Sequence, residues 1–365
     1  MSAPVVFRTE QTISGEQLGI ATLNVPKSLN SLSLEMIDLL AEQLLQWQQD
    51  SSIAAVWLDA EGDKAFCAGG DIVRLYESMV ETPKGERNRY AEDFFAREYR
   101  LDYLLHTFAK PVICWGHGIV MGGGLGLMSG CSHRVVTEKS RIAMPEITIG
   151  LHPDVGGSWF LNRMPGRTGV FLGLTGAHIN AADALFVGLA DRAIAHERKA
   201  QVMATLLATP AINDALVSAV LREHEMPTEQ LPVSTVRQNF DQINGLCDAD
   251  SVVELFARIT GYSGDDPWLQ RAAATLTKGC VQTAWLVWES QQRVRYLSLA
   301  DAFRMEWTMS VQCALHDDFR EGVRALLIDK DGSPAFRYQQ IGDFPAQVLE
   351  RFFVSPVLPH PLEAL

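Results

Sequence analysis

The chain has 365 residues, which is long for a single hydrophobic core and suggests two domains or one domain with a large extension. Hydrophobic residues make up 47% of it and charged residues 21%, which is ordinary for a soluble globular protein. The formal charge of −13 argues against nucleic acid or an anionic membrane as the main partner.

Six cysteines are spread along the chain without any CxxC pair. This distribution fits buried thiols in a reducing compartment better than a disulfide framework. Residues 1–20 lack a basic segment followed by an apolar one, and no apolar run is long enough to span a bilayer. We therefore expect a cytoplasmic protein.

The N-terminal segment predicts a strand pair, a helix and a further strand. Residues 5–7 and 19–24 have the pattern of two strands joined by a turn. Ser33 can cap a helix that runs to Gln49, because apolar residues recur along it at helical spacing. Residues 54–58 are a compact apolar run, which predicts a buried strand.

Two glycine-rich stretches follow. The first, residues 65–71, contains Gly69-Gly70 and by itself is equally well explained as a tight turn. The second, Gly122–Gly124, lies between an apolar run and a helix-like segment, so backbone N–H groups at the helix start have no partner. Together with the helix dipole, such donors form a site for a negatively charged oxygen.

A helix is expected over residues 94–108, with Phe94, Leu101, Leu105 and Phe108 on one apolar stripe. Glu98 falls on the same stripe. A carboxylate that faces inward needs a partner or a function, because burying a charge without compensation is costly. The alternatives are a solvated position at the helix edge or a pair with a neighbouring arginine.

Two more carboxylates stand in apolar surroundings further along. Glu146 lies within the apolar residues 142–149, and Asp154 follows eight positions later, just before Gly156-Gly157. Taken singly, Glu146 is explained as a buried carboxylate satisfied by backbone N–H groups, and Asp154 as a turn or helix-cap residue. An oxyanion donor and two carboxylates together favour an enzyme site.

Strand, turn and helix units alternate through the first 190 residues, which indicates a mainly parallel α/β architecture with crossover connections. From residue 200 onward the patterns are helical, apart from a loop-rich connection over residues 225–250. We therefore predict a core over residues 1–200 and a mainly helical C-terminal region over residues 201–365.

Three motifs, in this order, resemble the crotonase (enoyl-CoA hydratase/isomerase) superfamily: residues 66–71 (FCAGGD), 121–124 (MGGG) and 144–146 (MPE). Residues 318–325 (DFREGVRA) are similar to the C-terminal signature of that superfamily. Within it, the likeness is closest to the 3-hydroxyisobutyryl-CoA hydrolase branch. The residues that carry this likeness are Phe94-Phe95 with Glu98-Tyr99, His117–Ile119, Thr137–Lys139, Pro153–Gly157 and Leu327–Asp331.

The resemblance implies a crotonase-like ββα superhelix core with an α-helical C-terminal region that covers the active site. It implies an acyl-CoA substrate, no cofactor apart from the coenzyme A of the substrate itself, and an oxyanion hole made by the N–H groups of Gly70 and Gly123. Glu146 is then the catalytic glutamate, which either activates water or attacks the thioester. Asp154, a second catalytic residue, and Glu98 contact the acyl group, with the substrate 3-hydroxyl as the expected hydrogen-bond partner.

Two departures from the wider superfamily bear on the reaction. Hydratases place a second glutamate where this chain has Gly126, so one of the two acid/base groups for water addition is missing. At the position of Asp154 hydratases usually have glycine. Both differences favour thioester hydrolysis over hydration.

Other site types are not supported. A nucleophile elbow, a P-loop and a complete dinucleotide-binding motif are all missing from the sequence. Cys114 with His117, and Cys131 with His133, have no second pair at zinc spacing, so we expect no metal site. His117 is expected to be structural or to line a pocket. His152 either approaches the site or is an ordinary loop histidine.

The leading hypothesis is a 3-hydroxyacyl-CoA thioester hydrolase of valine breakdown. The alternatives are an enoyl-CoA hydratase or isomerase, and a non-catalytic CoA-binding protein. Arg74 and Lys330 are candidates for the CoA phosphates, although surface solvation explains each of them better. We expect a monomer or a small homo-oligomer.

Overall fold

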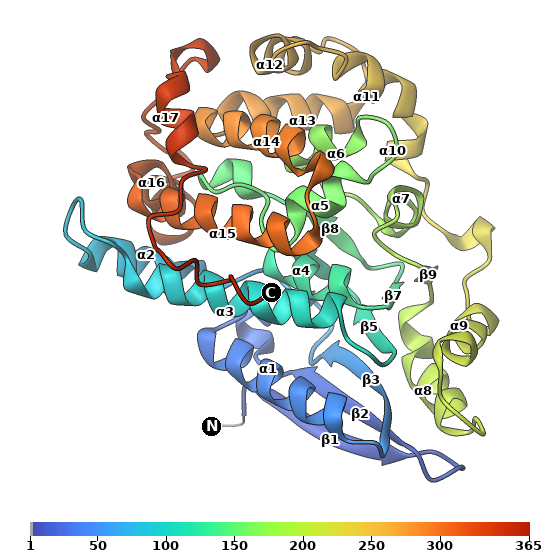
Figure 1. Cartoon of the computed structure of the whole chain (residues 1–365). Coiled ribbons are helices and arrows are strands. Elements are labelled where there is room, and N and C mark those ends of the chain that lie inside the picture. The colour runs from blue at the N-terminus through green and yellow to red at the C-terminus, as the bar shows by residue number, and fades with distance from the viewer. Residues whose placement is uncertain (1–2) are drawn as a thin grey trace. The chain divides into compact units, whose positions relative to one another are not determined.

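The computed structural model describes residues 3–365 (Figure 1), and two compact units are built from interleaved segments of the chain. Unit 1 contains the residues up to Gly70, Arg100–Ile142 and Ile179–Arg237. Unit 2 contains Asp71–Tyr99, Ala143–His178 and Gln238–Leu365. The division predicted from the sequence, between residues 200 and 201, follows chain order instead, and it stays a prediction.

Unit 1 is organised around a six-stranded sheet with the order β1-β2-β3-β5-β7-β9. β1 pairs antiparallel with β2, and the later neighbours pair parallel, which confirms the predicted mainly parallel α/β arrangement. The strands are β1 (Val5–Gln11), β2 (Gln17–Leu23), β3 (Ile53–Ala60), β5 (Val112–Gly116), β7 (His133–Val136) and β9 (Arg192–Ala193).

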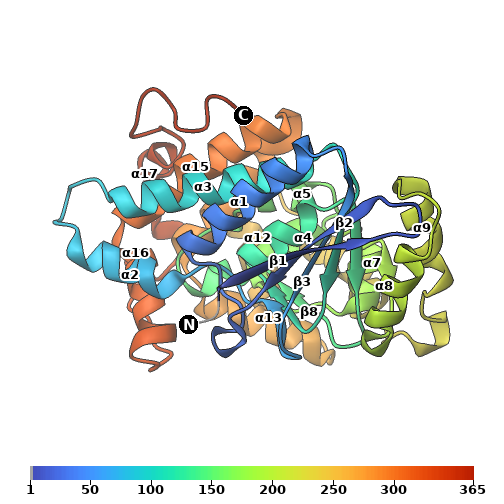
Figure 2. The same cartoon turned by 90° about the horizontal axis from the view of Figure 1, so that it is seen from below.

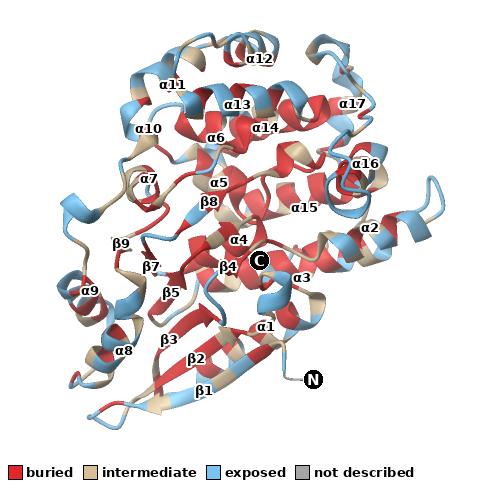
Figure 3. Cartoon of the chain, turned by 180° about the vertical axis from the view of Figure 1, so that it is seen from behind, coloured by how far each residue is buried: buried red, intermediate tan, exposed pale blue. Residues whose placement is uncertain are grey.

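The interior strands of this sheet are buried, as parallel strands covered by helices must be. Figure 3 shows β2, β3 and β5 almost wholly buried, whereas the edge strand β1 is largely exposed. Trp57 and Trp115 stack on neighbouring strands with ring centroids 5.6 Å apart. Helices α8 (Lys199–Leu207) and α9 (Asp214–Glu223), side by side in Figure 2, contribute apolar side chains to the same core.

The crossover from β2 to β3 is made by α1 (Leu34–Gln49), which begins where the sequence predicts. The Ser33 hydroxyl accepts a hydrogen bond from the N–H of Met36 at 3.2 Å, so Ser33 is the N-cap. The apolar stripe of α1 contains Met36, Ile37, Leu40, Leu44 and Trp47, all buried. Propensity, capping and packing therefore agree on this element.

A second, three-stranded sheet carries the glycine-rich loops. Its strands are β4 (Ala65–Cys67), β6 (Ile119–Met121) and β8 (Arg141–Ala143), in the order β4-β6-β8. β4 leads into Gly69-Gly70, and β6 leads into α4 (Gly123–Gly130), whose residues are all buried. The same short sheet therefore holds both loops in place.

Unit 2 is mainly helical. Its helices are α2 (Ile72–Glu81), α5 (Gly157–Asn162), α6 (Thr168–Thr175), α11 (Phe240–Leu246), α12 (Val252–Thr260), α13 (Pro267–Lys278), α14 (Val281–Arg293), α15 (Leu299–Leu315), α16 (Asp317–Val323) and α17 (Ala346–Arg351). A π-helical turn, Arg324–Ile328, extends α16. α14 contacts both α5 and α6, and α15 contacts α5. The remaining helices are α3 (Arg89–His106) and α10 (Thr235–Gln238), which each cross from one unit to the other, and α7 (Ala181–Val187) in unit 1.

The helical character predicted for the C-terminal half is confirmed, but the predicted loop-rich connection contains helices as well. Residues 225–250, expected to be a loop-rich connection, include α10 and α11. These helices are short, and Asn244 and Gly245 lie inside α11 rather than in a turn, so turn-forming residues misled the prediction. Within residues 3–365, no helix has the length and apolar character that crossing a membrane requires.

Gly124 tests the packing of α4 against β4. A Cβ at this position would lie 2.3 Å from the carbonyl oxygen of Cys67, well inside van der Waals contact. We expect Gly124→Ala to lower the free energy of unfolding by about 1–3 kcal/mol, as is typical of overpacked cores. Thermal unfolding followed by circular dichroism measures the change.

Gly245 in α11 is the matched control, because no atom outside its own helix lies within 4 Å of an added Cβ. Gly245→Ala should stabilise the protein by about 0.5–1 kcal/mol through helix propensity alone. A Gly124→Ala protein that melts at or above the wild-type temperature contradicts the close approach of α4 to β4.

Candidate active site

The two glycine-rich loops of unit 1 lie against each other. Gly69 has φ = +118°, a conformation that glycine adopts without steric cost. A Cβ built on Gly69 would lie 3.5 Å from Met121 O and 4.0 Å from Gly123 N. Gly123 is the first residue of α4, so its N–H has no acceptor inside the helix. The sequence-predicted oxyanion residues Gly70 and Gly123 therefore lie on neighbouring loops.

The three predicted carboxylates all belong to unit 2, and all are buried. Glu98 on α3 is 2% exposed, Glu146 at the start of a 3-10 helix (Glu146–Thr148) is 4% exposed, and Asp154 is 4% exposed. The solvated alternative for Glu98 is therefore wrong. Its place on the apolar stripe of α3 carries the side chain inward.

These carboxyl groups influence one another's ionisation. Burial raises the pKa of Glu98 and Glu146 well above the usual carboxyl range, and the nearby charge of Asp154 raises both further. Burial also raises the pKa of Asp154, to about 6. Like charges in a dry interior disfavour joint ionisation, so the three groups do not all carry charge at neutral pH.

Two carboxylate oxygens in this cluster lack a hydrogen-bond partner. Among residues 3–365, neither Glu98 Oε1 nor Glu146 Oε2 has one, although both atoms are buried. Buried polar atoms are nearly always paired in folded proteins. Backbone N–H groups therefore do not fully satisfy Glu146, and the two free oxygens are available to a bound molecule.

The backbone that carries Asp154 is strained. Val155 has φ = +53° and Gly156 has φ = +86°. A β-branched residue in the left-handed region costs about 1–3 kcal/mol and persists only where surrounding contacts enforce it. The strain falls directly beside Asp154, at the turn into α5.

Glu306 on α15 supplies the enforcing contacts. Its carboxylate accepts hydrogen bonds from the N–H of Gly156 at 2.7 Å, from the N–H of Ser158 at 2.8 Å and from the hydroxyl of Ser158. Burial raises the pKa of Glu306 to about 8, against the opposing effect of these donors. A residue in the C-terminal half thus fixes the loop of Asp154.

Three further polar side chains lie behind Asp154. The Tyr99 hydroxyl is 2.6 Å from Asp154 Oδ2 and 2.6 Å from Ser310 Oγ, and Ser310 Oγ is 3.0 Å from His152 Nε2. His152 is fully buried, which supports the first of its two sequence interpretations. His117 is not part of this group, because its Nε2 lies 2.7 Å from the carbonyl oxygen of Gly62 in unit 1.

Sequence reasoning missed Glu306 and Ser310. Both lie on α15, where Glu306 shares a helical stripe with the buried residues Phe303 and Trp307. A carboxylate on an apolar stripe was the signal that singled out Glu98, and the same signal was present here. Tyr99 was noted only as a neighbour of Glu98.

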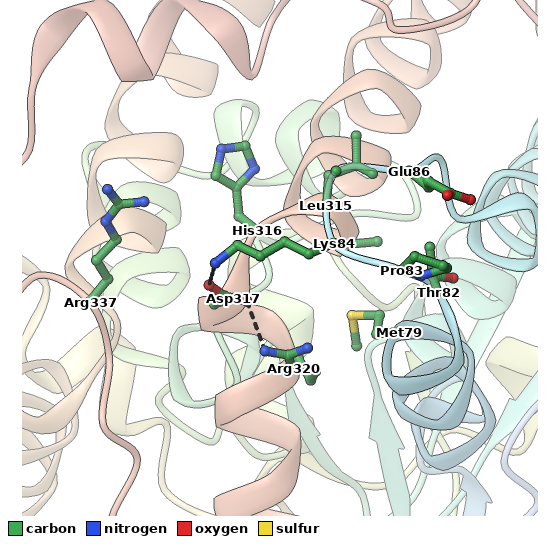
Figure 4. A pocket seen from close by; sticks show the side chains of 12 residues that line it. Met79, Thr82, Pro83, Lys84, Glu86, Leu315, His316, Asp317, Arg320 and Arg337 are labelled. Carbon is green, nitrogen blue, oxygen red and sulfur yellow. Dashed lines mark hydrogen bonds and ion pairs between the residues drawn. The ribbon is translucent and has the colours of Figure 1, made fainter.

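A separate cavity of about 160 Å³ in unit 2 lies between the α2–α3 loop and the α15–α16 junction (Figure 4). Three of its charged side chains pair with one another, since Asp317 lies 3.8 Å from Lys84 and 2.8 Å from Arg320. None of the three clustered carboxylates lines it. It therefore adds no acid or base to the cluster.

The candidates for CoA phosphates differ in their surroundings. Arg74 lies 3.3 Å from Glu77 and stacks over the ring of Tyr90 at 4.9 Å, so it is already paired. Lys330 is exposed. In unit 1, a cavity of about 370 Å³ is lined by Lys27, Lys64 and Ala65 among others, and Ala65 begins the strand that leads to Gly69-Gly70.

Within residues 3–365, no three or more His, Cys, Asp or Glu side chains are grouped so that they could hold a metal ion.

Glu306→Ala tests the anchoring of the Asp154 loop. The substitution leaves two buried N–H groups and one hydroxyl without their acceptor beside a strained turn. We expect the free energy of unfolding to fall by about 2–5 kcal/mol, measured by thermal or urea unfolding. Ser158→Ala removes one of the three hydrogen bonds and should cost about 1 kcal/mol. Equal losses in the two variants would show that the carboxylate is not the anchor.

Comparison with known proteins places this geometry in context. The profile of the family described as Enoyl-CoA hydratase/isomerase matches residues 18–353. The chain is 36% identical over 341 residues to a protein of Danio rerio named 3-hydroxyisobutyryl-CoA hydrolase, mitochondrial, with 92% of this chain and 87% of the relative covered. A Homo sapiens protein of the same name is 33% identical over 339 residues, with 92% and 86% covered.

Two solved structures are similar over nearly the whole chain. A structure titled as an enoyl-CoA hydratase from Rhodobacter sphaeroides 2.4.1 is 33% identical, with a TM-score of 0.84 and coverage of 97% of this chain and 98% of that one. A structure titled as a Carnitinyl-CoA dehydratase from Mycobacterium thermoresistibile is 32% identical, with a TM-score of 0.86 and coverage of 98% and 99%.

Proposed function

Because the chain belongs to the enoyl-CoA hydratase/isomerase family, we propose that it hydrolyses the thioester of a 3-hydroxyacyl-CoA, with 3-hydroxyisobutyryl-CoA of valine breakdown as substrate. Its fold is the α/β crotonase fold with an α-helical C-terminal region. Relatives that are 33–36% identical over 92% of the chain and named 3-hydroxyisobutyryl-CoA hydrolase support the substrate.

One observation carries the choice of hydrolysis. Asp154 is buried with Glu98 and Glu146, whereas position 126, which holds a glutamate in hydratases, is a glycine inside the buried helix α4. A second carboxylate is therefore present, but on the Pro153–Gly157 loop instead of on α4. This arrangement suits the binding and hydrolysis of an acyl group that has its own hydroxyl. It is less suited to the addition of water across a double bond.

In the proposed mechanism, the N–H groups of Gly70 and Gly123 bind the thioester carbonyl oxygen. Negative charge grows on this oxygen when the carbonyl is attacked, and losing one such donor typically costs about 10²–10³ in rate. Glu146 either takes a proton from the attacking water or attacks the carbonyl itself to give an anhydride that water then cleaves. The thiol of coenzyme A leaves in both routes, and neither needs a further cofactor.

Glu98 and Asp154 hold the acyl group in this proposal. The free oxygen Glu98 Oε1 is an acceptor for the substrate 3-hydroxyl, which would satisfy a buried group that lacks a partner. Glu146 Oε2 remains free for water or the carbonyl carbon. Lys27 and Lys64 at the cavity of unit 1 are our candidates for the CoA phosphates.

The alternative is hydration or isomerisation of an enoyl-CoA. The two solved structures are titled as a hydratase and a dehydratase at 32–33% identity, which is no more similar than the relatives named hydrolases. Hydration uses two acid/base groups. Because residue 126 is a glycine, Asp154 would have to act as the second acid/base group beside Glu146. A catalytically silent CoA-binding protein is the third possibility, which the buried, partner-free Glu146 oxygen disfavours.

We also propose that residues 1–200 form the CoA-thioester-binding core and that residues 201–365 cover the active site. The contacts of Glu306 and Ser310 with the segment 152–158 support this division of labour. The cytoplasm is the proposed compartment, since all six cysteines are buried thiols outside any disulfide, which fits a reducing environment. The relatives carry the word mitochondrial in their names, and that compartment is the alternative. A monomer or small homo-oligomer is proposed as the assembly.

Glu146→Gln tests the function directly. Removing the base or nucleophile while keeping the side-chain volume should lower kcat for thiol release from 3-hydroxyisobutyryl-CoA by about 10³-fold or more, because acid–base and covalent catalysis both depend on this carboxylate. Free thiol is measured with a chromogenic disulfide, and crotonyl-CoA hydration is followed by ultraviolet absorbance on the same preparation.

Glu42→Gln, on the exposed side of α1, is the matched control and should turn over like wild type. Thiol release without hydration supports hydrolysis. Hydration without thiol release supports the alternative enzyme, and a wild-type protein silent in both assays supports the binding protein. Full activity in Glu146→Gln removes Glu146 from the mechanism.

Substrate discrimination tests the role of Glu98. Wild type should prefer 3-hydroxyisobutyryl-CoA over isobutyryl-CoA in kcat/KM by about 10²-fold or more, because an analogue without the hydroxyl leaves a buried acceptor unpaired. In Glu98→Ala this preference should fall to within about tenfold, mainly through loss of activity on the hydroxylated substrate. A preference that survives Glu98→Ala would assign hydroxyl recognition to another group.

A further inference from the structure

The direction of the Gly70 N–H, one of the two proposed oxyanion donors, is set by the carbonyl group beside it. The carbonyl of Gly69 and the N–H of Gly70 belong to one planar trans peptide unit, in which they point in opposite directions. The carbonyl oxygen of Gly69 accepts a hydrogen bond from the N–H of Leu32 at 2.8 Å, and the Cys67 thiol lies 3.5 Å from the same oxygen. Whatever holds Leu32 in place therefore also aims the Gly70 N–H, away from Leu32.

The contact from Leu32 is part of a longer pairing between two segments of unit 1. The N–H of Ala68 donates to the carbonyl oxygen of Leu29 at 3.1 Å, and Leu32 and Gly70 form an isolated parallel bridge. Residues 25–32, which we call the Asn30 loop, thus lie alongside residues 68–70. Since Gly69 at φ = +118° is conformationally permissive, its carbonyl keeps one direction only if the Asn30 loop is itself fixed.

The backbone of the Asn30 loop is strained. Leu29 and Asn30 both have φ = +55°. Asparagine adopts the left-handed region more readily than most residues, but leucine does so only at a cost. Such a conformation persists where surrounding contacts enforce it. The loop therefore needs contacts that hold this turn.

The side chain of Asn30 makes these contacts. Its Nδ2 donates to the carbonyl oxygens of Glu61 and Ala65, both at 3.0 Å, and its Oδ1 accepts from the N–H of Val25 at 2.8 Å. Carbonyl oxygens only accept and a backbone N–H only donates, so these partners fix which end of the amide faces which. Asn30 is 1% exposed, and both its donor and its acceptor group are in use.

The partners of Asn30 connect the loop to the strand that carries the oxyanion donor. Val25 begins the Asn30 loop itself, Glu61 directly follows β3, and Ala65 is the first residue of β4. β4 leads into Gly69-Gly70. One buried side chain thus holds the Asn30 loop against both ends of the segment that joins β3 to β4.

We propose that Asn30 is a positioning residue for the oxyanion hole. Through Leu32 and the carbonyl of Gly69, it keeps the N–H of Gly70 in the direction that the thioester carbonyl oxygen requires. The proposal rests on the proposed function, which gives this N–H its catalytic role. Fixed donors stabilise the transition state strongly because they need no reorientation when charge grows on the oxygen. Asn30 itself does not contact the substrate in this role.

Asn30→Gly removes the side-chain contacts without adding backbone strain, because glycine accepts φ = +55° freely. We expect kcat for thiol release from 3-hydroxyisobutyryl-CoA to fall about 10²-fold and KM to change by less than about threefold, because the misdirected donor acts mainly in the transition state. A loop that only shaped the cavity lined by Lys27 and Lys64 would raise KM and leave kcat unchanged, and that result overturns the proposal.

Infrared spectroscopy reads the donor directly. The substrate 3-hydroxyisobutyryl-CoA, labelled with carbon-13 at the thioester carbonyl, is bound to Glu146→Gln, and the difference from the unlabelled complex isolates its C=O stretch. Hydrogen bonds from the oxyanion hole should lower this frequency relative to the thioester in water. When Asn30→Gly is added to Glu146→Gln, we expect a smaller downshift. An unchanged downshift overturns the proposal even if kcat falls.

Leu40→Ala is the control for loss of stability. Leu40 is 1% exposed on the buried stripe of α1, in the same unit. The cavity left by the substitution should lower the melting temperature. We expect kcat to stay at the wild-type value, and the downshift to stay unchanged when Leu40→Ala is combined with Glu146→Gln. Equal losses of kcat in Leu40→Ala and Asn30→Gly would mean that turnover follows stability, and the positioning role would then be wrong.

Asn30→Asp covers the case in which Asn30→Gly does not fold. Aspartate tolerates the left-handed region, and its carboxylate can still accept from the N–H of Val25. An ionised carboxylate cannot donate to Glu61 and Ala65. We therefore expect the same fall in kcat and the same smaller downshift. Wild-type values in a folded Asn30→Asp protein count against the proposal, and circular dichroism checks the folding of each variant.

A measurement on the substrate-free wild-type protein needs no variant. Nuclear magnetic resonance detects scalar coupling across a hydrogen bond, here between the amide nitrogen of Leu32 and the carbonyl carbon of Gly69. We expect this coupling to be present. Its absence would show that Leu32 does not hold the Gly69 carbonyl, and the proposal would fail at its first step.

The role of Asn30 and the proposed function can fail separately. If wild type releases no thiol but lowers the C=O frequency of the bound thioester, and Asn30→Gly reduces this downshift, the positioning role stands and hydrolysis fails. If thiol is released and Asn30→Gly leaves kcat and the downshift unchanged, hydrolysis stands and the positioning role fails. A bound thioester without any downshift in Glu146→Gln removes Gly70 from the oxyanion hole and overturns the proposal.

Discussion

The hydrogen bonds from Gly156 and Ser158 to the Glu306 carboxylate determine whether Asp154 can have a fixed place. The turn they hold contains Val155 at φ = +53°, a conformation that a β-branched residue does not keep without external support. Because Glu306 is buried, its carboxylate is stabilised by the same hydrogen-bond donors. Glu306 and the loop of residues 153–157 therefore stabilise each other. Helix α15, which carries Glu306, is for this reason part of the site.

Burial determines the ionisation of the three clustered carboxyl groups. In water, Glu98, Glu146 and Asp154 would ionise together and be solvated. In the dry interior of unit 2 their pKa values rise and protons are retained. Oxygens without a partner raise the energy of the empty site, and a ligand that pairs with them recovers that energy. A site of this kind discriminates by what a substrate can hydrogen-bond, and it favours an acyl group with a hydroxyl.

Local sequence patterns predicted the elements that local physics controls. The Ser33 cap of α1, the buried strand β3 and the glycine-rich loops each follow from spacing over a few residues. The apolar stripe around Glu98 left its inward position as one of several alternatives, and the structure decides for it. Glu306 also lies on an apolar stripe, but spacing alone could not assign the contacts of Glu306 and Ser310, because their partners at 152–158 lie some 150 positions earlier in the chain. The interleaved units were also beyond reach, since a composition shift near residue 200 marks chain order and not which segments pack together.

The curated relatives of this chain support hydrolysis, while solved structures of similar identity are titled for other reactions. Proteins named hydrolases match it at 33–36% identity, and structures titled as a hydratase and a dehydratase match it at 32–33%. Shared identity at this level reports the common fold, on which different reactions are built. The positions of the carboxyl groups bear on which reaction the site can carry out. In this chain position 126 has no side chain, and Asp154 lies at the end of a hydrogen-bonded line that reaches His152. The placement of those groups agrees with the hydrolase names of the curated relatives, and both support thioester hydrolysis.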